Sequence, residues 1–267
     1  MKLHHERTRT GGPVLVLSNS LGTNLHIWDA MMDDLTEHCD VIRYDQRGHG
    51  QSPHVHDPYT VADLGKDLID LLDEEAVDRA FFCGVSMGAL TGQWLGVHHS
   101  DRLLGLILSN TASKIGTDET WNNRIQTVLD NGLEPIADAV VSGWISTALR
   151  KSDPVLFQDL VDMLLGQDPA SYAAACGAVR DAHLTNAIAS IEVPTLVIAG
   201  TYDIPTPPTS AHALASAIPG AQYVEIPAAH VSPIEAPRQY AYALLGFIKD
   251  HPTKVGPTRD HPTKDHS

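Results

Sequence analysis

A serine, an aspartate and a histidine occur along the chain in an order that suits nucleophilic catalysis. Ser86 lies in the segment GVSMG at residues 84–88, between a strand-like apolar run and a helix-like run. A sharp strand-to-helix turn there would expose its hydroxyl, and glycines on either side avoid collisions. A hydroxyl is a weak nucleophile, so it needs a base, a group that orients the base, and donors for the oxyanion. We predict Ser86 as the nucleophile; the alternative is a serine that only caps a helix.

His230 is the predicted base. It follows the last strand-like segment, at the carboxyl end of a late strand, where ligands gather in open α/β sheets. Asp203 follows the apolar run at residues 195–200, and its carboxylate would orient the imidazole. Along the chain the nucleophile comes first, the acid second and the histidine last, which is the order expected when the nucleophile lies on a turn between a strand and a helix. A surface-loop histidine and a turn-forming aspartate are the alternatives, and Asp181 and Asp57 are fallback acids.

Two main-chain N–H groups are predicted to bind the oxyanion. One belongs to Met87, the residue after the nucleophile, and the other to Leu21 in the loop NSLGT at residues 19–23. Because these donors belong to the main chain, substituting either side chain need not abolish activity.

Alternating strand and helix patterns would position these groups. Continuous apolar runs predict buried parallel strands at residues 14–19, 39–44, 80–85, 104–110, 195–200 and 222–226. Helical spacing predicts helices at residues 59–75, 87–98, 211–217 and 233–249. The expected fold class is therefore α/β, with a mostly parallel central sheet flanked by helices.

Residues 111–190 interrupt this alternation. They contain helical patterns at 120–131, 135–149, 154–165 and 170–180 and no convincing strand. We predict a helical cap at 111–190, inserted into a core formed by residues 1–110 and 191–249. The tail at 250–267 repeats the segment DHPTK, is polar throughout, and is expected to be disordered.

Composition excludes several classes of partner. The net charge of −15 opposes binding to nucleic acid or an anionic membrane, and no apolar run is long enough to span a bilayer. Cys39, Cys83 and Cys176 are odd in number and widely spaced, which fits a reducing cytoplasm. The N-terminal residues MKLHHER lack the apolar region of a secretory signal, so a cytoplasmic location is expected. Assembly into a homo-oligomer stays open.

No cofactor or metal is expected. His54, His56 and Asp57 resemble a metal-ligand cluster, but no second cluster with ligand spacing follows. The segment RGHGQS at residues 47–52 is interpreted as a structural turn near the pocket, because neither a P-loop nor a dinucleotide-binding glycine motif is present.

Four segments together resemble the α/β-hydrolase superfamily: LSNSLGT at 17–23, YDQRGHG at 44–50, GVSMG at 84–88 and DIPTP at 203–207. More narrowly, they resemble the bacterial 3-oxoadipate enol-lactonases of the β-ketoadipate pathway, as do LTGQWLG at 90–96 and NTASKIG at 110–116. The resemblance extends over residues 1–249. One departure is Ala89, which follows Gly88 where the family commonly has a second glycine.

The resemblance implies an α/β-hydrolase fold and hydrolysis of 3-oxoadipate enol-lactone to 3-oxoadipate, in the catabolism of aromatic compounds. The reaction would proceed through a Ser-His-Asp triad and an acyl-enzyme, with no cofactor, and the partner would be a small lactone. The alternatives are a general carboxylesterase, a cofactor-free perhydrolase of the haloperoxidase type and, from another class, a non-catalytic ligand receptor. A small pocket with a cation would favour the lactonase, and a wide apolar pocket the esterase.

The acetate arm of such a lactone needs a cationic partner. The predicted cap supplies Arg124, Arg150 and Arg180, and we favour Arg124 and Arg180 because guanidinium groups bind carboxylates in bidentate geometry. Trp144 is the candidate aromatic wall. The alternatives are arginines on a solvated helix face and a tryptophan buried in the core of the cap.

Overall fold

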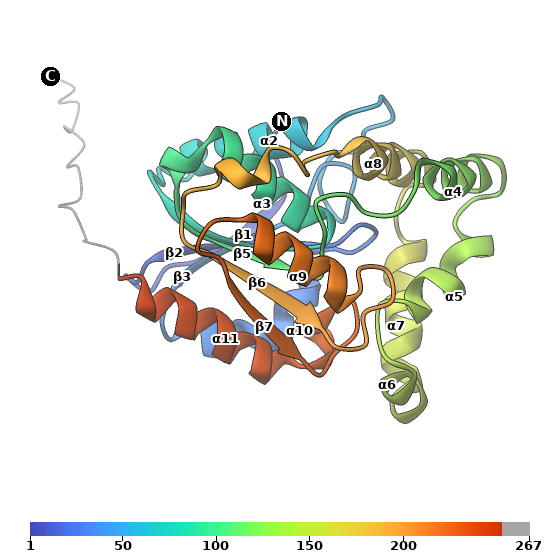
Figure 1. Ribbon diagram of the computed structural model, residues 1–267. Helices are drawn as coiled ribbons and strands as arrows, with labels where there is room; N and C mark the ends of the chain where they lie inside the picture. The colour runs from blue at the N-terminus through green and yellow to red at the C-terminus, as the bar shows by residue number, and fades with distance from the viewer. Residues whose placement is uncertain (253–267) are drawn as a thin grey trace, which may run out of the picture.

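A seven-stranded sheet runs through the centre of the molecule in the computed structural model, which describes residues 1–252 (Figure 1). The strand order is β1-β3-β2-β4-β5-β6-β7, and every neighbouring pair except β1–β3 is parallel. The strands are β1 (His5–Thr8), β2 (Val14–Ser18), β3 (Asp40–Tyr44), β4 (Ala80–Val85), β5 (Leu103–Ser109), β6 (Thr195–Gly200) and β7 (Gln222–Ile226). All six strands predicted from apolar runs are present, within a residue or so of the predicted bounds.

The edge strand β1 was not among the predictions. Its four residues, HERT, alternate between half-buried and exposed and include no large apolar side chain. The strand is held instead by antiparallel pairing with β3 and by Arg7, whose guanidinium donates to the Glu75 carboxylate at 3.0 Å. Such partners are distant in sequence, so hydrophobic periodicity has no access to them.

Helices cover both faces of the sheet, with α2 and α3 on one side and α11 on the other (Figure 1). The core helices are α1 (Met32–Thr36), α2 (Val61–Glu74), α3 (Met87–His98), α9 (Pro208–Ala217), α10 (Ser232–Glu235) and α11 (Pro237–Asp250). The single helix predicted over 233–249 is divided between α10 and α11. Pro237 opens α11, because proline has no N–H to continue the preceding helix.

The chain between β5 and β6 is helical and lies together at one end of the molecule (Figure 1). Its helices are α4 (Asp118–Asn131), α5 (Glu134–Ser142), α6 (Thr147–Ser152), α7 (Pro154–Leu165) and α8 (Pro169–Asp181). The helix predicted over 135–149 is divided at Gly143, because the Ser146 hydroxyl caps the start of α6. Helix α4 packs against α8, and this pair forms one wall of the pocket described below.

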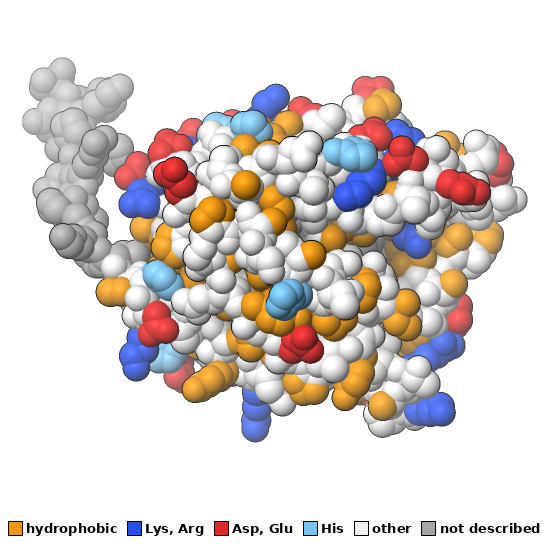
Figure 2. Space-filling model, in the orientation of Figure 1, with side chains coloured by type: hydrophobic (Ala, Val, Ile, Leu, Met, Phe, Trp, Pro, Cys, Tyr) orange, Lys and Arg blue, Asp and Glu red, His pale blue; other side chains and the backbone are white. Residues whose placement is uncertain are grey.

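The surface is mixed in character. On the face in Figure 2, acidic and basic side chains are interspersed with apolar ones. No helix within residues 1–252 is long and apolar enough to cross a membrane. The predicted disordered tail lies, beyond residue 252, outside the residues that the structure describes.

Candidate active site

Ser86 occupies a strained turn between β4 and α3. Its φ of 56° lies in the left-handed region, which a non-glycine residue adopts only when its surroundings impose it. The surroundings leave no room for side chains on either flank: a Cβ on Gly84 would lie 2.4 Å from the carbonyl of Gly88, and a Cβ on Gly88 would lie 2.4 Å from that of Ser18. The Ser86 N–H donates to the Ser109 carbonyl at 2.9 Å, which ties the turn to the end of β5. The GVSMG segment therefore forms the predicted sharp turn.

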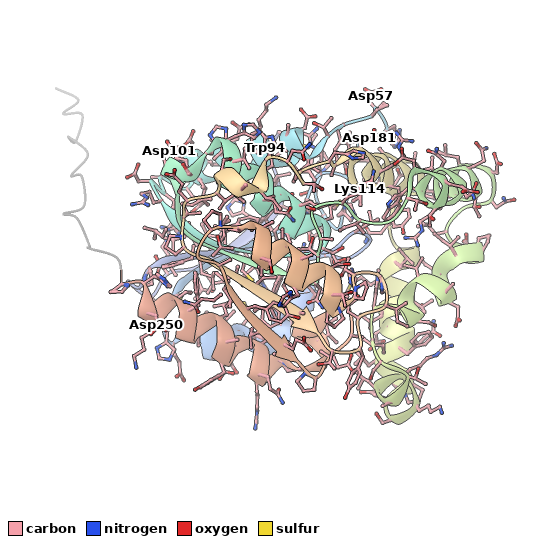
Figure 3. All side chains as sticks on the ribbon, viewed as in Figure 1. Asp57, Trp94, Asp101, Lys114, Asp181 and Asp250 are labelled. Carbon is pink, nitrogen blue, oxygen red and sulfur yellow. The ribbon has the colours of Figure 1, made fainter. Side chains whose placement is uncertain are left out.

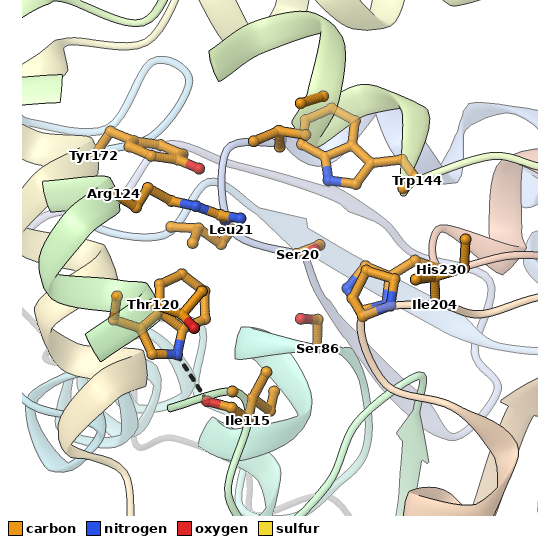
Figure 4. Close-up of a pocket in the computed structure, with 16 residues that line it drawn as sticks. Ser20, Leu21, Ser86, Ile115, Thr120, Arg124, Trp144, Tyr172, Ile204 and His230 are labelled. Carbon is orange, nitrogen blue, oxygen red and sulfur yellow. Dashed lines mark hydrogen bonds between the residues drawn. The ribbon is translucent and has the colours of Figure 1, made fainter. Parts of the chain in front are cut away.

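The side chains of Asp203 and His230 contact each other. They follow β6 and β7, and adjacent parallel strands bring their carboxyl ends to the same edge of the sheet. His230 Nδ1 lies 3.0 and 3.1 Å from the two carboxylate oxygens of Asp203, and both side chains are buried. Because an ionised carboxylate only accepts, Nδ1 carries the proton and Nε2 is left without one, as the predicted base requires. His230 and Ser86 line the same pocket (Figure 4).

Two further residues hold Asp203, and sequence reasoning missed both. Asn110 Nδ2 donates to its Oδ2 at 2.9 Å. Thr206 donates from its main-chain N–H at 2.9 Å and from its hydroxyl at 2.8 Å. Burial alone would raise the pKa of Asp203, but the neighbouring His230 and these hydrogen bonds outweigh it and lower the pKa. The one sequence signal was position: Asn110 directly follows β5, and Thr206 lies three residues after the acid.

The predicted oxyanion donors have free N–H groups. Within residues 1–252 neither the Leu21 nor the Met87 N–H donates to a protein acceptor, as expected of Met87 at the first position of α3. The Leu21 loop is fixed by its neighbour, because the Gly22 N–H donates to His49 Nε2 at 3.0 Å. His49 Nδ1 in turn donates to the Arg47 carbonyl at 3.1 Å. The segment RGHGQS thus orients the loop that carries Leu21.

A cavity of about 270 Å³ lies over Ser86, between the sheet edge and α4, α5 and α8. In Figure 4, Arg124 and Tyr172 project from one side and His230 from the other, with Trp144 above. Its other lining residues are Ser20, Leu21, Ile115, Gly116, Thr120, Trp121, Ala139, Val140, Gly143, Ile204 and Pro205. The cavity walls are mainly apolar, so its few polar groups decide which ligands fit.

Arg124 is a cation without a protein anion. Arg150 and Arg180 pair with Asp138 and Asp181, but Arg124 forms no ion pair with any carboxylate in the described part of the chain. Its guanidinium instead lies over the ring of Trp121, 4.9 Å from the centroid. This free guanidinium faces the same cavity as Ser86.

Tyr172, which sequence reasoning missed, lies beside Arg124. Its side chain is fully buried, and its hydroxyl makes no hydrogen bond of regular geometry among the residues described, although the Arg124 guanidinium and the Cys176 thiol lie close enough to interact with it. Burial raises the pKa of Tyr172, so the phenol keeps its proton and is able to donate. A buried donor without a regular hydrogen bond is uncommon and points to a ligand or water.

The expectation that Arg180 joins Arg124 in the pocket requires correction. Arg180 lies near the end of α8, where its guanidinium donates twice to Asp181 at 2.8 Å and once to Asn122 at 2.7 Å. It lines a separate surface groove, not the cavity over Ser86. Neither fallback acid is the carboxylate at the imidazole, which is that of Asp203: Asp181 is bound to Arg180, and Asp57 lies on a loop near α8 (Figure 3).

Comparison with known proteins identifies relatives of the whole fold. Residues 13–143 match the family model described as alpha/beta hydrolase fold. The chain is 37% identical over 237 residues to 3-oxoadipate enol-lactonase 2 of Acinetobacter baylyi, covering 89% of each chain. The crystal structure of the enol-lactonase from Burkholderia xenovorans LB400 superposes with a TM-score of 0.90 at 38% identity, covering 92% of this chain and 96% of that one.

A more distant relative carries a different name. The putative carbamate hydrolase RutD of Variovorax paradoxus is 29% identical, over 82% of this chain and 85% of its own length. The predicted fold, with its mostly parallel sheet and flanking helices, is confirmed. The chain belongs to the α/β-hydrolase family and is a hydrolase that resembles the 3-oxoadipate enol-lactonases.

Proposed function

We propose that this protein hydrolyses 3-oxoadipate enol-lactone to 3-oxoadipate, with Ser86 as nucleophile, His230 as base and Asp203 as the acid that orients it. The observation that carries the proposal is the guanidinium of Arg124, which lines the small cavity over Ser86 and forms no ion pair within residues 1–252. An enol-lactone with an acetate arm presents an ester and a carboxylate together, and the cavity offers a nucleophile and a cation to match. Identity of 36–37% to two named enol-lactonases supports the same substrate.

In the acylation step, Ser86 Oγ attacks the ring carbonyl carbon while His230 Nε2 accepts the hydroxyl proton. The Asp203 carboxylate holds Nδ1 and stabilises the imidazolium that forms. The Leu21 and Met87 N–H groups, free of protein acceptors, bind the oxyanion. Collapse breaks the bond to the ring oxygen, and the His230 imidazolium returns its proton to that oxygen, which leaves as an enol that remains attached to the acyl chain.

The enol lowers the demand on the general acid. It is a better leaving group than an alkoxide, and it tautomerises to the ketone of the product. Neutral His230 then takes a proton from water as the water attacks the acyl carbon, and it returns that proton to Ser86 Oγ as the bond between the acyl carbon and Ser86 breaks. Every proton and electron pair in this scheme is handled by the chain and water.

Recognition of the carboxylate falls to α4 and α8. Arg124 supplies charge, and the Tyr172 hydroxyl supplies a neutral donor beside it (Figure 4). Trp144 on the segment after α5 closes the cavity as an apolar wall. The esterase alternative would suit a wide apolar pocket, whereas this cavity is small and cationic.

The proposal is tested by adding purified enzyme to the enol-lactone and following the loss of the lactone's ultraviolet absorbance. We expect turnover that Ser86→Ala abolishes while its circular dichroism stays that of the parent. Arg124→Gln should weaken kcat/KM for the enol-lactone and leave hydrolysis of p-nitrophenyl acetate, which carries no carboxylate, within about twofold. Hydrolysis of p-nitrophenyl acetate without enol-lactone turnover would replace the lactonase by an esterase, and full activity in Ser86→Ala would overturn the mechanism.

A further inference from the structure

Two histidines of the core and one aspartate of the helical segment form a cluster remote from the triad. His54 and His56 lie on the loop between β3 and α2, and Asp168 caps the N-terminus of α8. His54 Nδ1 is 3.8 Å from Asp168 Oδ1, and His56 Nε2 is 3.1 Å from Oδ2. The loop approaches α8 at the end of the molecule where Figure 3 labels Asp57 and Asp181. Sequence spacing alone shows two of these groups, and the fold adds the third.

The distances suit ligands of one metal ion. Bonds of about 2.0–2.2 Å around a tetrahedral ion separate ligand atoms by about 3.3–3.6 Å. With one ligand atom from each residue, the three atoms all lie within 4.8 Å of one another, and each imidazole nitrogen lies 3.8 or 3.1 Å from a different oxygen of the Asp168 carboxylate. Because the side chains of His54 and His56 are exposed, they have room to rotate toward an ion beside Asp168. Imidazole nitrogens with one carboxylate oxygen suit zinc and nickel rather than calcium or magnesium.

The backbone that carries these ligands is already fixed. Between the two histidines, the Val55 N–H donates to the Ser171 hydroxyl on α8 at 3.0 Å. Asp168 Oδ2 accepts from the Ser171 N–H at 2.8 Å, which holds the carboxylate at the start of the helix. Binding an ion would order few additional groups, because loop and helix are joined without it.

We propose that His54, His56 and Asp168 bind a divalent transition-metal ion of the zinc class, with water completing its coordination. The bound ion connects the loop at residues 53–58 to the start of α8. Because α8 also carries Tyr172, the site stabilises the wall of the catalytic cavity without supplying a catalytic group. The proposal is independent of the substrate assigned above.

The chain offers a matched control. His26 and Asp29 form an exposed histidine–aspartate pair at 3.0 Å, and no second histidine or third ligand joins them among the described residues. The variants His54→Asn/His56→Asn remove two ligands, and His26→Asn removes one histidine of the control pair. Asp168→Asn removes the carboxylate but keeps an oxygen that can cap α8.

Isothermal titration of the full chain with ZnCl₂, after dialysis against a chelator, counts the sites. We expect the parent and His26→Asn to bind one more equivalent of zinc than His54→Asn/His56→Asn, and Asp168→Asn to bind it at least tenfold more weakly. Hydrogen exchange of α8 amides should slow with zinc in the parent and in His26→Asn, but not in His54→Asn/His56→Asn. Equal stoichiometry and affinity in the double variant, or the same loss in His26→Asn, would refute the site. Circular dichroism in chelator should match for all variants, which separates lost binding from lost folding.

Discussion

Replacing Tyr172 by phenylalanine should raise the stability of the protein and lower its activity toward the enol-lactone. The hydroxyl of Tyr172 is buried and makes no regular hydrogen bond in the described chain, so only the nearby Arg124 guanidinium and Cys176 thiol offset its loss of water on folding. An unsatisfied buried polar group costs about 1–3 kcal/mol, and phenylalanine fills the same space without that group. We therefore expect the free energy of unfolding of Tyr172→Phe to rise by about 1–3 kcal/mol.

The same change should reduce activity toward a substrate that carries a carboxylate. A hydrogen bond to a charged acceptor contributes about 1.5–3 kcal/mol, which is roughly 10- to 150-fold in kcat/KM. Hydrolysis of p-nitrophenyl acetate, which presents no carboxylate to the α4–α8 wall, should change by less than about twofold. Opposite signs in stability and activity are typical of a group retained for binding rather than for folding.

Urea unfolding followed by circular dichroism measures the first effect, and enol-lactone absorbance measures the second. Tyr44→Phe is the matched control, because that buried phenol has a partner: its oxygen lies 2.8 Å from the Ser18 hydroxyl. The control should lose about 0.5–1.5 kcal/mol. If Tyr172→Phe loses as much as Tyr44→Phe and keeps its kcat/KM for the enol-lactone, the hydroxyl is not a substrate donor and the reasoning fails.

Three further outcomes follow from the site. Burial lowers the pKa of His49, so below about pH 6.5 the unfolded chain binds a proton at this residue more readily than the folded chain does. The free energy of unfolding should therefore fall as the pH decreases below about 6.5. In urea unfolding at several pH values, His49→Gln should make this dependence on pH weaker. Asp203→Asn should reduce kcat by roughly 10³- to 10⁴-fold in steady-state assays with the fold intact, since His230 loses its acceptor; a loss below tenfold would contradict the triad. Gly88→Ala should lower the free energy of unfolding by about 1–3 kcal/mol, because its Cβ would meet the Ser18 carbonyl, and an unchanged urea midpoint would show that α3 yields there.

The strands and the catalytic triad candidates were accessible to sequence reasoning because their signals are local. Buried parallel strands appear as continuous apolar runs, and β4 and β6 are buried along their whole length. The GVSMG segment sits directly at the end of β4, so its role follows from its neighbours in the chain. Asp203 and His230 were selected because each follows a strand, and a parallel sheet brings such positions together.

Features that depend on distant partners were not accessible. Arg124 and Arg180 are both arginines on predicted helices, and only the packing of α4 against α8 leaves Arg124 facing the cavity while Arg180 pairs with Asp181. The edge strand β1 lacks an apolar pattern and exists through its pairing with β3. Asn110 reaches Asp203 across 93 positions of sequence. Each of these features depends on contacts between residues that are far apart in the sequence, and a local sequence pattern does not indicate such contacts.

The sequence by itself determined the fold class, the order of the strands along the chain, and the serine, acid and histidine placed at their ends. These follow from periodicity and from glycines that a tight turn requires. Tertiary structure alone decided that, within residues 1–252, Arg124 lines the cavity over Ser86 without an ion pair. It also decided that Tyr172 lies beside Arg124 without a regular hydrogen bond in that part of the chain, and that Asp168 joins His54 and His56. The physical reason is that burial and pairing depend on which groups the fold brings together. A guanidinium is available to a ligand's carboxylate where the fold places no protein carboxylate beside it.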